Sequence, residues 1–179
     1  MGTLIDVTSR PVRGTRAAGA PLQLVPGESR GAPPSGLVLR HRLGGYREYH
    51  APAEMAGWAE ALWTYRAPAD DESTHRILPD PALSVAFCYT RHLDGRPREP
   101  QLMVFGPKLQ PVMSQYSPGA EIVAVKLKLE WAAPMLQLVP ADHLGGAHDL
   151  AEIHPTLAKR LLDGLAESRG VGQALDLLA

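Results

Sequence analysis

The segment from Thr74 to Phe87, with the sequence THRILPDPALSVAF, constrains the fold of this chain more than any other. Two runs, Thr74 to Leu78 and Leu83 to Thr90, have the length and the apolar and aromatic content of β-strands. Pro79 and Pro81 lie between them and cannot donate a hydrogen bond to a neighbouring strand. We therefore expect a bend, bulge or sheet edge at this join. Alternate side chains share one face of the second strand: Leu83, Val85, Phe87 and Tyr89.

Further strands are expected along the chain. The clearest period-two pattern runs from Glu121 to Glu130, where four apolar residues share one face and a more polar set shares the other. This pattern predicts a strand with one buried side. Shorter strands are expected at residues 101–105 and 112–116, and another strand is expected to begin at Trp63. Several short strands separated by turn signals predict a mainly β fold, an antiparallel sandwich or barrel.

Helices are expected chiefly near the C-terminal end. Residues 54–61 and 131–138 have the spacing of short helices, and a better helix opens at His154-Pro155. The apolar stripe of that last helix consists of Leu157, Leu161, Leu162 and Leu165. Such a stripe packs either on the protein's own sheet or on a second copy of the chain, and the sequence leaves both alternatives open.

Composition limits the class of protein. The chain has 179 residues, 45% of them hydrophobic, which is enough for one sizeable core and too few for two ordinary domains. It contains no run of about 20 apolar residues, the length that spans a bilayer. Its single cysteine, Cys88, lies in an apolar run, where it resembles a buried hydrophobic residue of a reduced protein. We therefore expect a cytoplasmic protein without a membrane partner.

Charge is distributed unevenly. Residues 1–45 carry six arginines against two carboxylates, whereas the remainder carries 12 basic and 17 acidic residues. The first 45 residues are rich in Gly, Pro, Ser and Arg, so we expect a disordered basic arm. The arm is either a nucleic-acid contact or an unstructured extension, and the scattered arginines favour the extension. An acidic body is a poor ligand for duplex DNA, because non-specific affinity comes from phosphate neutralisation.

Signatures of catalysis are absent from the sequence. The seven histidines include no His-x-His pair, and the spacing of His143, His148 and His154 is not that of a chelating strand or helix. No Gly-x-Ser-x-Gly elbow surrounds a serine, and no basic residue adjoins Cys88. We therefore expect no metal site, no cofactor and no enzymatic activity.

Six segments in order resemble the N-terminal, cupin-like sensor domain of AraC-type bacterial transcriptional regulators. RILPD and FGP are the most specific of them. The segments are Tyr46-Arg47-Glu48-Tyr49, Trp63-Thr64, His75 to Asp80, Phe105-Gly106-Pro107, Ala124 to Leu127 and Leu138 to Ala141. The resemblance implies a cupin-like barrel at residues 46–150, followed by a helical dimerisation or linker segment at 151–179.

The resemblance also implies a function. In such regulators the sensor domain binds a small effector, forms a homodimer and precedes a pair of helix-turn-helix motifs, which this chain does not contain. The implied partners are thus a small-molecule effector and a second copy of the chain, with DNA contacted only through a domain outside it. Two alternatives stay open: a free-standing metal-dependent cupin enzyme and a protein interaction module without a ligand.

Candidate ligand-binding residues are aromatic or polar side chains on the expected strands, as is usual for a pocket wall with a few fixed polar groups. They are Trp63, His75, Arg76, Tyr89, Phe105 and Lys126. A structural role competes with ligand binding near the prolines: Arg76 and Asp80 could form an ion pair, or Asp80 could cap the turn. The candidate dimerisation residues are the leucines of the C-terminal stripe.

Overall fold

The computed structural model describes residues 5–6, 37–69 and 73–178, and in these residues the fold is mainly β with helices near the C-terminal end. The strands are β1 (Ile5–Asp6), β2 (Leu39–Leu43), β3 (Tyr46–His50), β4 (Ala59–Arg66), β5 (Ser73–Ile77), β6 (Leu83–Arg91), β7 (Pro97–Phe105), β8 (Val112–Tyr116), β9 (Glu121–Leu127) and β10 (Ala147–Asp149). The helices are α1 (Leu129–Leu136), the 3-10 helix η1 (Pro140–His143), α2 (Leu150–Ile153), α3 (Pro155–Leu165) and α4 (Val171–Leu178).

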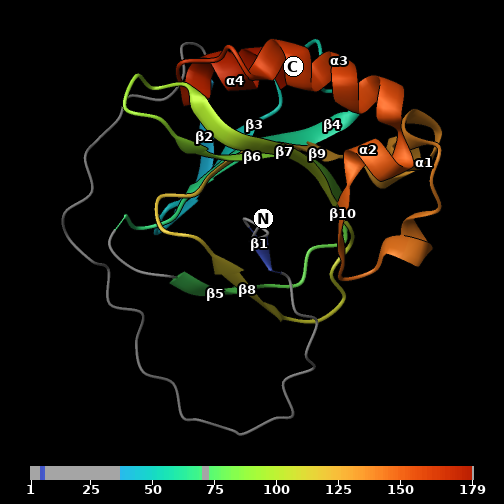
Figure 1. The fold of residues 1–179 in the computed structure, drawn as a ribbon. Helices are drawn as coiled ribbons and strands as arrows, with labels where there is room; N and C mark the ends of the chain where they lie inside the picture. The colour runs from blue at the N-terminus through green and yellow to red at the C-terminus, as the bar shows by residue number, and fades with distance from the viewer. Residues whose placement is uncertain (1–4, 7–36, 70–72, 179) are drawn as a thin grey trace, which may run out of the picture.

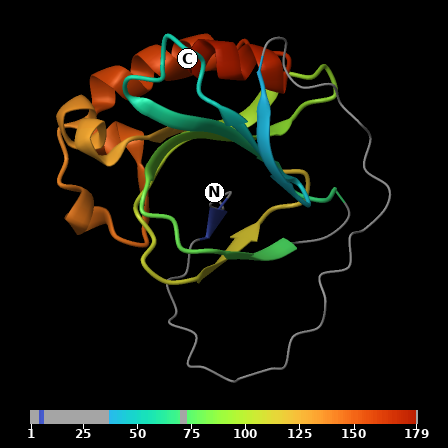
Figure 2. The same cartoon turned by 180° about the vertical axis from the view of Figure 1, so that it is seen from behind.

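The strands form two antiparallel sheets. A seven-stranded sheet has the order β10-β7-β6-β9-β4-β3-β2, and a three-stranded sheet has the order β1-β8-β5. Helices α3 and α4 cover one face of the large sheet, and the small sheet lies on its other side (Figures 1 and 2). The expectation of an antiparallel sandwich or barrel with C-terminal helices is confirmed, although the sheets do not close into a complete barrel.

Strand β9 lies in the middle of the large sheet and is buried on both sides. Val123, Val125 and Leu127 contact the core under the helices, whereas Ile122 and Ala124 contact a second core toward the small sheet. The prediction of one buried side is wrong because the strand has a layer on each face. The strand also ends at Leu127, and the expected continuation to residue 130 instead enters α1.

The predicted break at the two prolines is confirmed. Residues 78–82 carry the chain from β5 in the small sheet to β6 in the large sheet, and we call this segment the crossover. Within it, the backbone of Asp80 exchanges two hydrogen bonds with that of Lys108, at N to O distances of 2.9 and 2.7 Å. Pro79 and Pro81 flank this isolated bridge, so neither has to donate to a strand.

Ordered structure begins before Tyr46. Strand β2 pairs with β3, and Ile5–Asp6 pairs with β8, so the predicted disordered arm at 1–45 is wrong at both of these segments. The rest of the predicted arm, residues 1–4 and 7–36, lies outside the described residues. Every residue of β2 is exposed, so its sequence does not show the alternation of apolar and polar residues that marks a half-buried strand. Its backbone pairing with β3 defines it as a strand.

Two other boundaries differ from the prediction. Residues 53–58 form consecutive hydrogen-bonded turns in place of the expected helix, and β4 begins at Ala59. Strand β7 begins at Pro97, four residues before the expected position. Only residues 103–105 of β7 pair with β10, so Pro97 and Pro100 lie where β7 is an edge strand, which is the position that tolerates proline.

The leucine stripe of α3 packs on the protein's own sheet. Leu165 is fully buried, and Leu157, Leu161 and Leu162 are partly buried against the core formed by β6, β7 and β9. A leucine that is 0% exposed within one chain has no surface left for a second copy. The expectation that Leu165 contributes to a dimer interface is therefore wrong, and the other three leucines retain only part of their surface.

Candidate functional site

Three of the predicted ligand-binding residues lie together on the face of the large sheet that is turned toward the small sheet. Lys126 of β9 and Phe105 of β7 both pair in register with Ser84 of β6, so the three residues form one row across the sheet. Trp63 of β4 donates from Nε1 to Ser84 Oγ at 3.1 Å, and its ring lies 6.2 Å from that of Phe105. The sequence prediction thus brings Trp63, Phe105 and Lys126 to one site.

The structure does not bring Tyr89 and Arg76 to this row. Tyr89 is fully buried on the opposite, helix-covered face, where its hydroxyl accepts a hydrogen bond from Arg91 at 2.9 Å. Arg76 of β5 is exposed.

His75 lies on the small sheet, away from Lys126. Its ring packs against Tyr65 and Tyr116 with centroid distances of 5.0 and 5.7 Å, and its Nε2 contacts the Tyr65 hydroxyl. Burial lowers the pKa of His75. His75 therefore belongs to the aromatic core between the two sheets.

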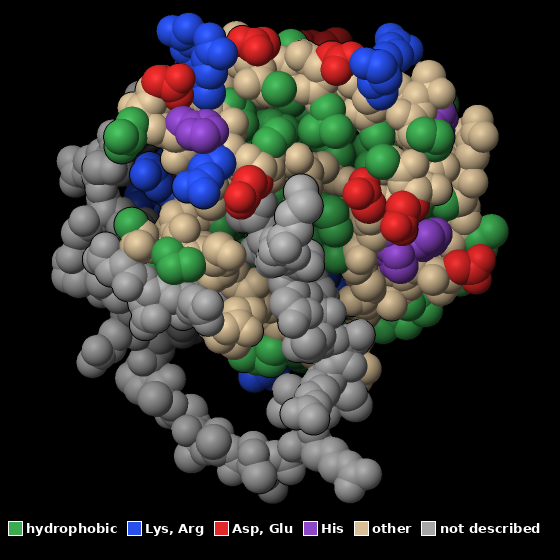
Figure 3. Space-filling view, viewed as in Figure 1, with side chains coloured by type: hydrophobic (Ala, Val, Ile, Leu, Met, Phe, Trp, Pro, Cys, Tyr) green, Lys and Arg blue, Asp and Glu red, His purple; other side chains and the backbone are tan. Residues whose placement is uncertain are grey.

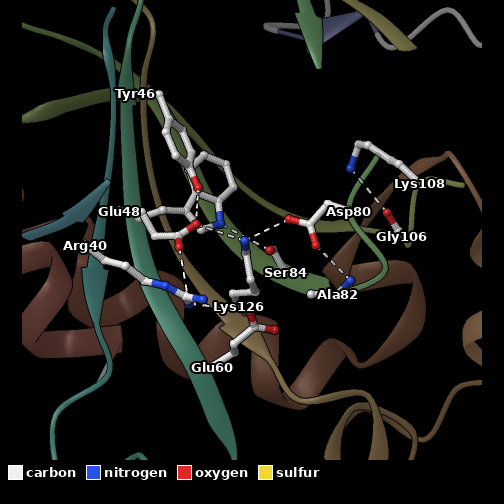
Figure 4. Close-up of polar contacts among 11 residues, drawn as sticks. Arg40, Tyr46, Glu48, Glu60, Asp80, Ala82, Ser84, Gly106, Lys108 and Lys126 are labelled. Carbon is white, nitrogen blue, oxygen red and sulfur yellow. Dashed lines mark hydrogen bonds and ion pairs between the residues drawn. The ribbon is translucent and has the colours of Figure 1, made fainter. Parts of the chain in front are cut away.

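Lys126 is the centre of a buried ion cluster, which consists of Lys126, Glu48, Asp80, Tyr46 and Arg40 (Figure 4). Its Nζ lies 2.9 Å from a Glu48 oxygen and 2.8 Å from an Asp80 oxygen, and its side chain is only 9% exposed. Burial would lower the pKa of Lys126, but the hydrogen bonds and charges of the two carboxylates outweigh it and raise the pKa. The ammonium group is therefore held charged between β3 and the crossover.

Glu48 is the buried anion of the cluster, and sequence analysis did not single it out. Tyr46 and Glu48 lie two residues apart on the same face of β3, and the Tyr46 hydroxyl donates to Glu48 at 2.6 Å. Arg40 lies 3.4 Å from its other oxygen. Burial would raise the pKa of Glu48, but the hydrogen bonds from Tyr46 and Lys126, with the positive charges of Lys126 and Arg40, lower it overall.

Asp80 has two separate functions in the crossover. One carboxylate oxygen accepts a hydrogen bond from the backbone N–H of Ala82 at 3.0 Å and so caps the turn, which confirms the capping interpretation. The other oxygen pairs with Lys126 and not with Arg76, so the predicted Arg76–Asp80 ion pair is wrong. Arg76 lies within β5 and its side chain is exposed, so it does not reach the Asp80 oxygen that Lys126 holds.

Lys108 lies beside this cluster, after the end of β7. Its Nζ donates to the carbonyl oxygen of Gly106 at 3.2 Å and lies 5.6 Å from the centre of the Phe105 ring. Burial lowers the pKa of Lys108; the charge of Asp80 opposes this effect and the charge of Lys126 adds to it. No carboxylate of the described residues lies within 4.0 Å of its ammonium group.

The histidines include one pair that sequence spacing did not predict. His143 of η1 and His148 of β10 lie with their ring centres 4.4 Å apart and their planes nearly perpendicular. Burial and the neighbouring His143 lower the pKa of His148. Two imidazoles are fewer than the three or four ligands of protein zinc sites. Within the described residues, no group of three metal-ligating side chains was found.

The fold and the site together define a mainly β domain with a buried ion cluster between two sheets. A family model described as a domain of unknown function, DUF6597, matches residues 47–148, and the chain belongs to this family. The matched range contains β4 to β9 and all of β3 except its first residue, and with them Glu48, Asp80 and Lys126 of the ion cluster; Arg40 and Tyr46 lie before it. Neither the curated proteins nor the solved structures contain a match to the chain. Among the described helices, none has the length and apolar character required to cross a membrane.

Proposed function

We propose that this chain is the effector-sensing and dimerisation domain of an AraC-type transcriptional regulator, with a cupin-like fold and no enzymatic activity. The resemblance of its strand segments to such sensor domains supports the proposal, and so does the arrangement of two antiparallel sheets with C-terminal helices. The single observation that carries it is the ion pair between Lys126 and Asp80, which joins the large sheet to the crossover.

The ion cluster supports a sensing role because of its energetic cost. Taking charges out of water costs several kcal/mol per ion, and an apolar replacement is often as stable, so a buried cluster is weak evidence for stability alone. Ionisable groups in such surroundings are candidates for a functional site. An effector that contacts Lys126 or Trp63 would compete with the bond to Asp80 and move the crossover.

Movement of the crossover provides the mechanism. Asp80 is bonded through its side chain to β9 and through its backbone to Lys108, so its release would alter contacts of both the small sheet and the segment after β7. The effector shifts the population between the two arrangements by its difference in affinity for them. The C-terminal helices share a core with β9 and would carry the change to a neighbouring domain or subunit.

Contact with DNA is assigned to a domain outside this chain. On the face shown in Figure 3, outside the grey atoms, basic and acidic side chains are interspersed and no broad basic surface is visible. A duplex requires several phosphate contacts from Lys or Arg for tight binding. Dimerisation would use the surface that Leu157, Leu161 and Leu162 leave exposed, together with neighbouring side chains of α3.

A chimaera tests the proposal directly. The chain is fused to a helix-turn-helix domain that activates a reporter gene only as a dimer, and cells are grown with a panel of small metabolites. We expect reporter activity that at least one metabolite changes, and loss of that response in Trp63→Ala. A Tyr89→Phe variant is the matched control, because Tyr89 lies on the opposite face of the sheet.

Two results would contradict the proposal. Dimerisation would be excluded if the purified chain is monomeric by analytical ultracentrifugation at all concentrations and the chimaera also gives no reporter activity. Stoichiometric iron, zinc or manganese that is lost on His75→Ala would instead favour the metal-dependent enzyme.

A further inference from the structure

The partners of Lys126 differ in how easily they could be replaced. The Glu48 side chain is 10% exposed and has further bonds from Tyr46 and Arg40, so it is fixed in place. The Asp80 side chain is 36% exposed, and its bond to the turn at Ala82 uses its other oxygen. The Asp80 oxygen on Lys126 is therefore the partner that an incoming group can displace.

Lys108 adds a second ammonium group whose hydrogen-bonding capacity is only partly used. An ammonium group has three donors, and in the described residues one bond, to the Gly106 carbonyl at 3.2 Å, is formed. Its backbone is hydrogen bonded to that of Asp80, and Figure 4 shows the two side chains next to each other. The Asp80 carboxylate thus pairs with one ammonium group, that of Lys126, and lies near a second, that of Lys108, without forming an ion pair with it. Two positive charges close to one partly exposed carboxylate attract a second negative group.

An aromatic surface adjoins these ammonium groups. The rings of Tyr46, Trp63 and Phe105 follow one another across β3, β4 and β7, with centre distances of 5.7 and 6.2 Å and plane angles of 35° and 30°. Tyr46 and Trp63 are only partly buried, and Lys108 lies over the Phe105 ring. Flat apolar groups pack well on such surfaces.

We propose, building on the function proposed above, that the effector is a small aromatic carboxylic acid whose carboxylate replaces Asp80 on Lys126 and accepts a bond from Lys108. Its ring lies against Trp63 and Phe105. Asp80 in the free protein then acts as an internal substitute for the ligand's carboxylate. Binding breaks the only ion pair that the described residues show between the large sheet and the crossover.

Benzoate is the probe, with benzamide as its uncharged counterpart and acetate as the acid without a ring. Binding is measured by isothermal titration calorimetry on the purified chain and by the shift of its melting temperature. Hydrogen bonds to charged groups contribute more than neutral ones, so we expect benzoate to bind at least about tenfold more tightly than benzamide or acetate.

Variants test the geometry without removing Lys126, whose loss could unfold the protein. Lys108→Met should weaken benzoate binding about tenfold, and Lys108→Arg should restore part of it. Asp80→Asn removes the competing charge but keeps the turn-capping oxygen, so it should bind benzoate severalfold more tightly. Lys159→Met, which changes an exposed lysine of α3, is the control and should bind as the unaltered chain does.

The outcomes separate this inference from the proposed function. Equal affinity for benzoate and benzamide, or weaker benzoate binding by Asp80→Asn, would overturn the carboxylic-acid assignment. Neutral metabolites that bind in a Trp63-dependent manner, while acids do not, would also overturn it and leave the sensor function standing. If the chimaera responds to no compound at all, including benzoate, both proposals fail.

Discussion

Replacement of Lys126 by methionine tests whether the ion cluster is as buried as the structure shows. Methionine keeps most of the side-chain volume but removes the ammonium group that lies 2.9 Å from Glu48 and 2.8 Å from Asp80. The two carboxylates then differ in their fate. Asp80 can be hydrated, whereas Glu48, which is 10% exposed, stays buried with only Tyr46 and Arg40 as partners.

The expected cost follows from these exposures. Removal of one partner of a buried ion pair destabilises a protein by about 3 to 5 kcal/mol. Because Tyr46 and Arg40 still contact Glu48, we expect the lower end, about 3 kcal/mol. The partly exposed pair with Asp80 adds less than about 1 kcal/mol.

Urea denaturation followed by circular dichroism measures this loss. With an m value of about 2 kcal/mol/M, a loss of about 3 kcal/mol lowers the urea midpoint by about 1.5 M. The double variant Lys126→Met, Glu48→Gln should recover about 2 kcal/mol, since it no longer buries an unpaired charge. Lys159→Met, in an exposed ion pair with Asp163, should cost less than about 1 kcal/mol.

A loss below about 1 kcal/mol in Lys126→Met, with no recovery in the double variant, would contradict this prediction. That result would mean that water reaches Glu48 and compensates for the missing ammonium group.

Three further predictions concern packing and pH. A Cβ at Gly106 would lie 1.6 Å from the His143 carbonyl oxygen, so Gly106→Ala should lower the free energy of unfolding by about 3 kcal/mol. Gly57→Ala is the control and should leave the free energy of unfolding unchanged, because a Cβ at Gly57 would meet open space. Leu165→Ala should cost about 3 kcal/mol in urea denaturation without changing the sedimentation behaviour, because this leucine is buried within its own chain. The folded state lowers the pKa of His148, so the unfolded state binds more protons below about pH 6.5. The free energy of unfolding should therefore fall as the pH decreases through that range. His148→Gln should make this dependence on pH weaker, and an unchanged dependence would contradict the effect of burial on His148.

The position of several strands along the chain could be predicted from the sequence. Strands β5, β6 and β8 lie within one residue of their expected limits, because their apolar alternation and the prolines between β5 and β6 are local signals. Strand β2 could not be predicted in this way, since all of its side chains are exposed and only its pairing with β3 defines it.

The candidate site could be predicted in part. Trp63, Phe105 and Lys126 were expected as pocket residues and do lie together, but Tyr89 lies on the other face. The alternation within β6 correctly places Tyr89 on the same face as Phe87. Which residues of β9 lie on that face depends on the register between the two strands, and the sequence pattern does not contain this register. Glu48 could not be predicted as a site residue either, because its partner, Lys126, lies 78 residues away along the chain.

The exposed strand β2 has a consequence for the behaviour of the protein in concentrated solution. Within the described residues it pairs only with β3, so its other side presents backbone groups that could add a strand from another molecule. Its sequence, LRHRL, places Arg40 and Arg42 along that edge. A second molecule docking there through the same strand would bring arginines against arginines, and such repulsion is a common protection of sheet edges against aggregation. The charged side chains of this strand would therefore oppose growth of the large sheet at its β2 edge.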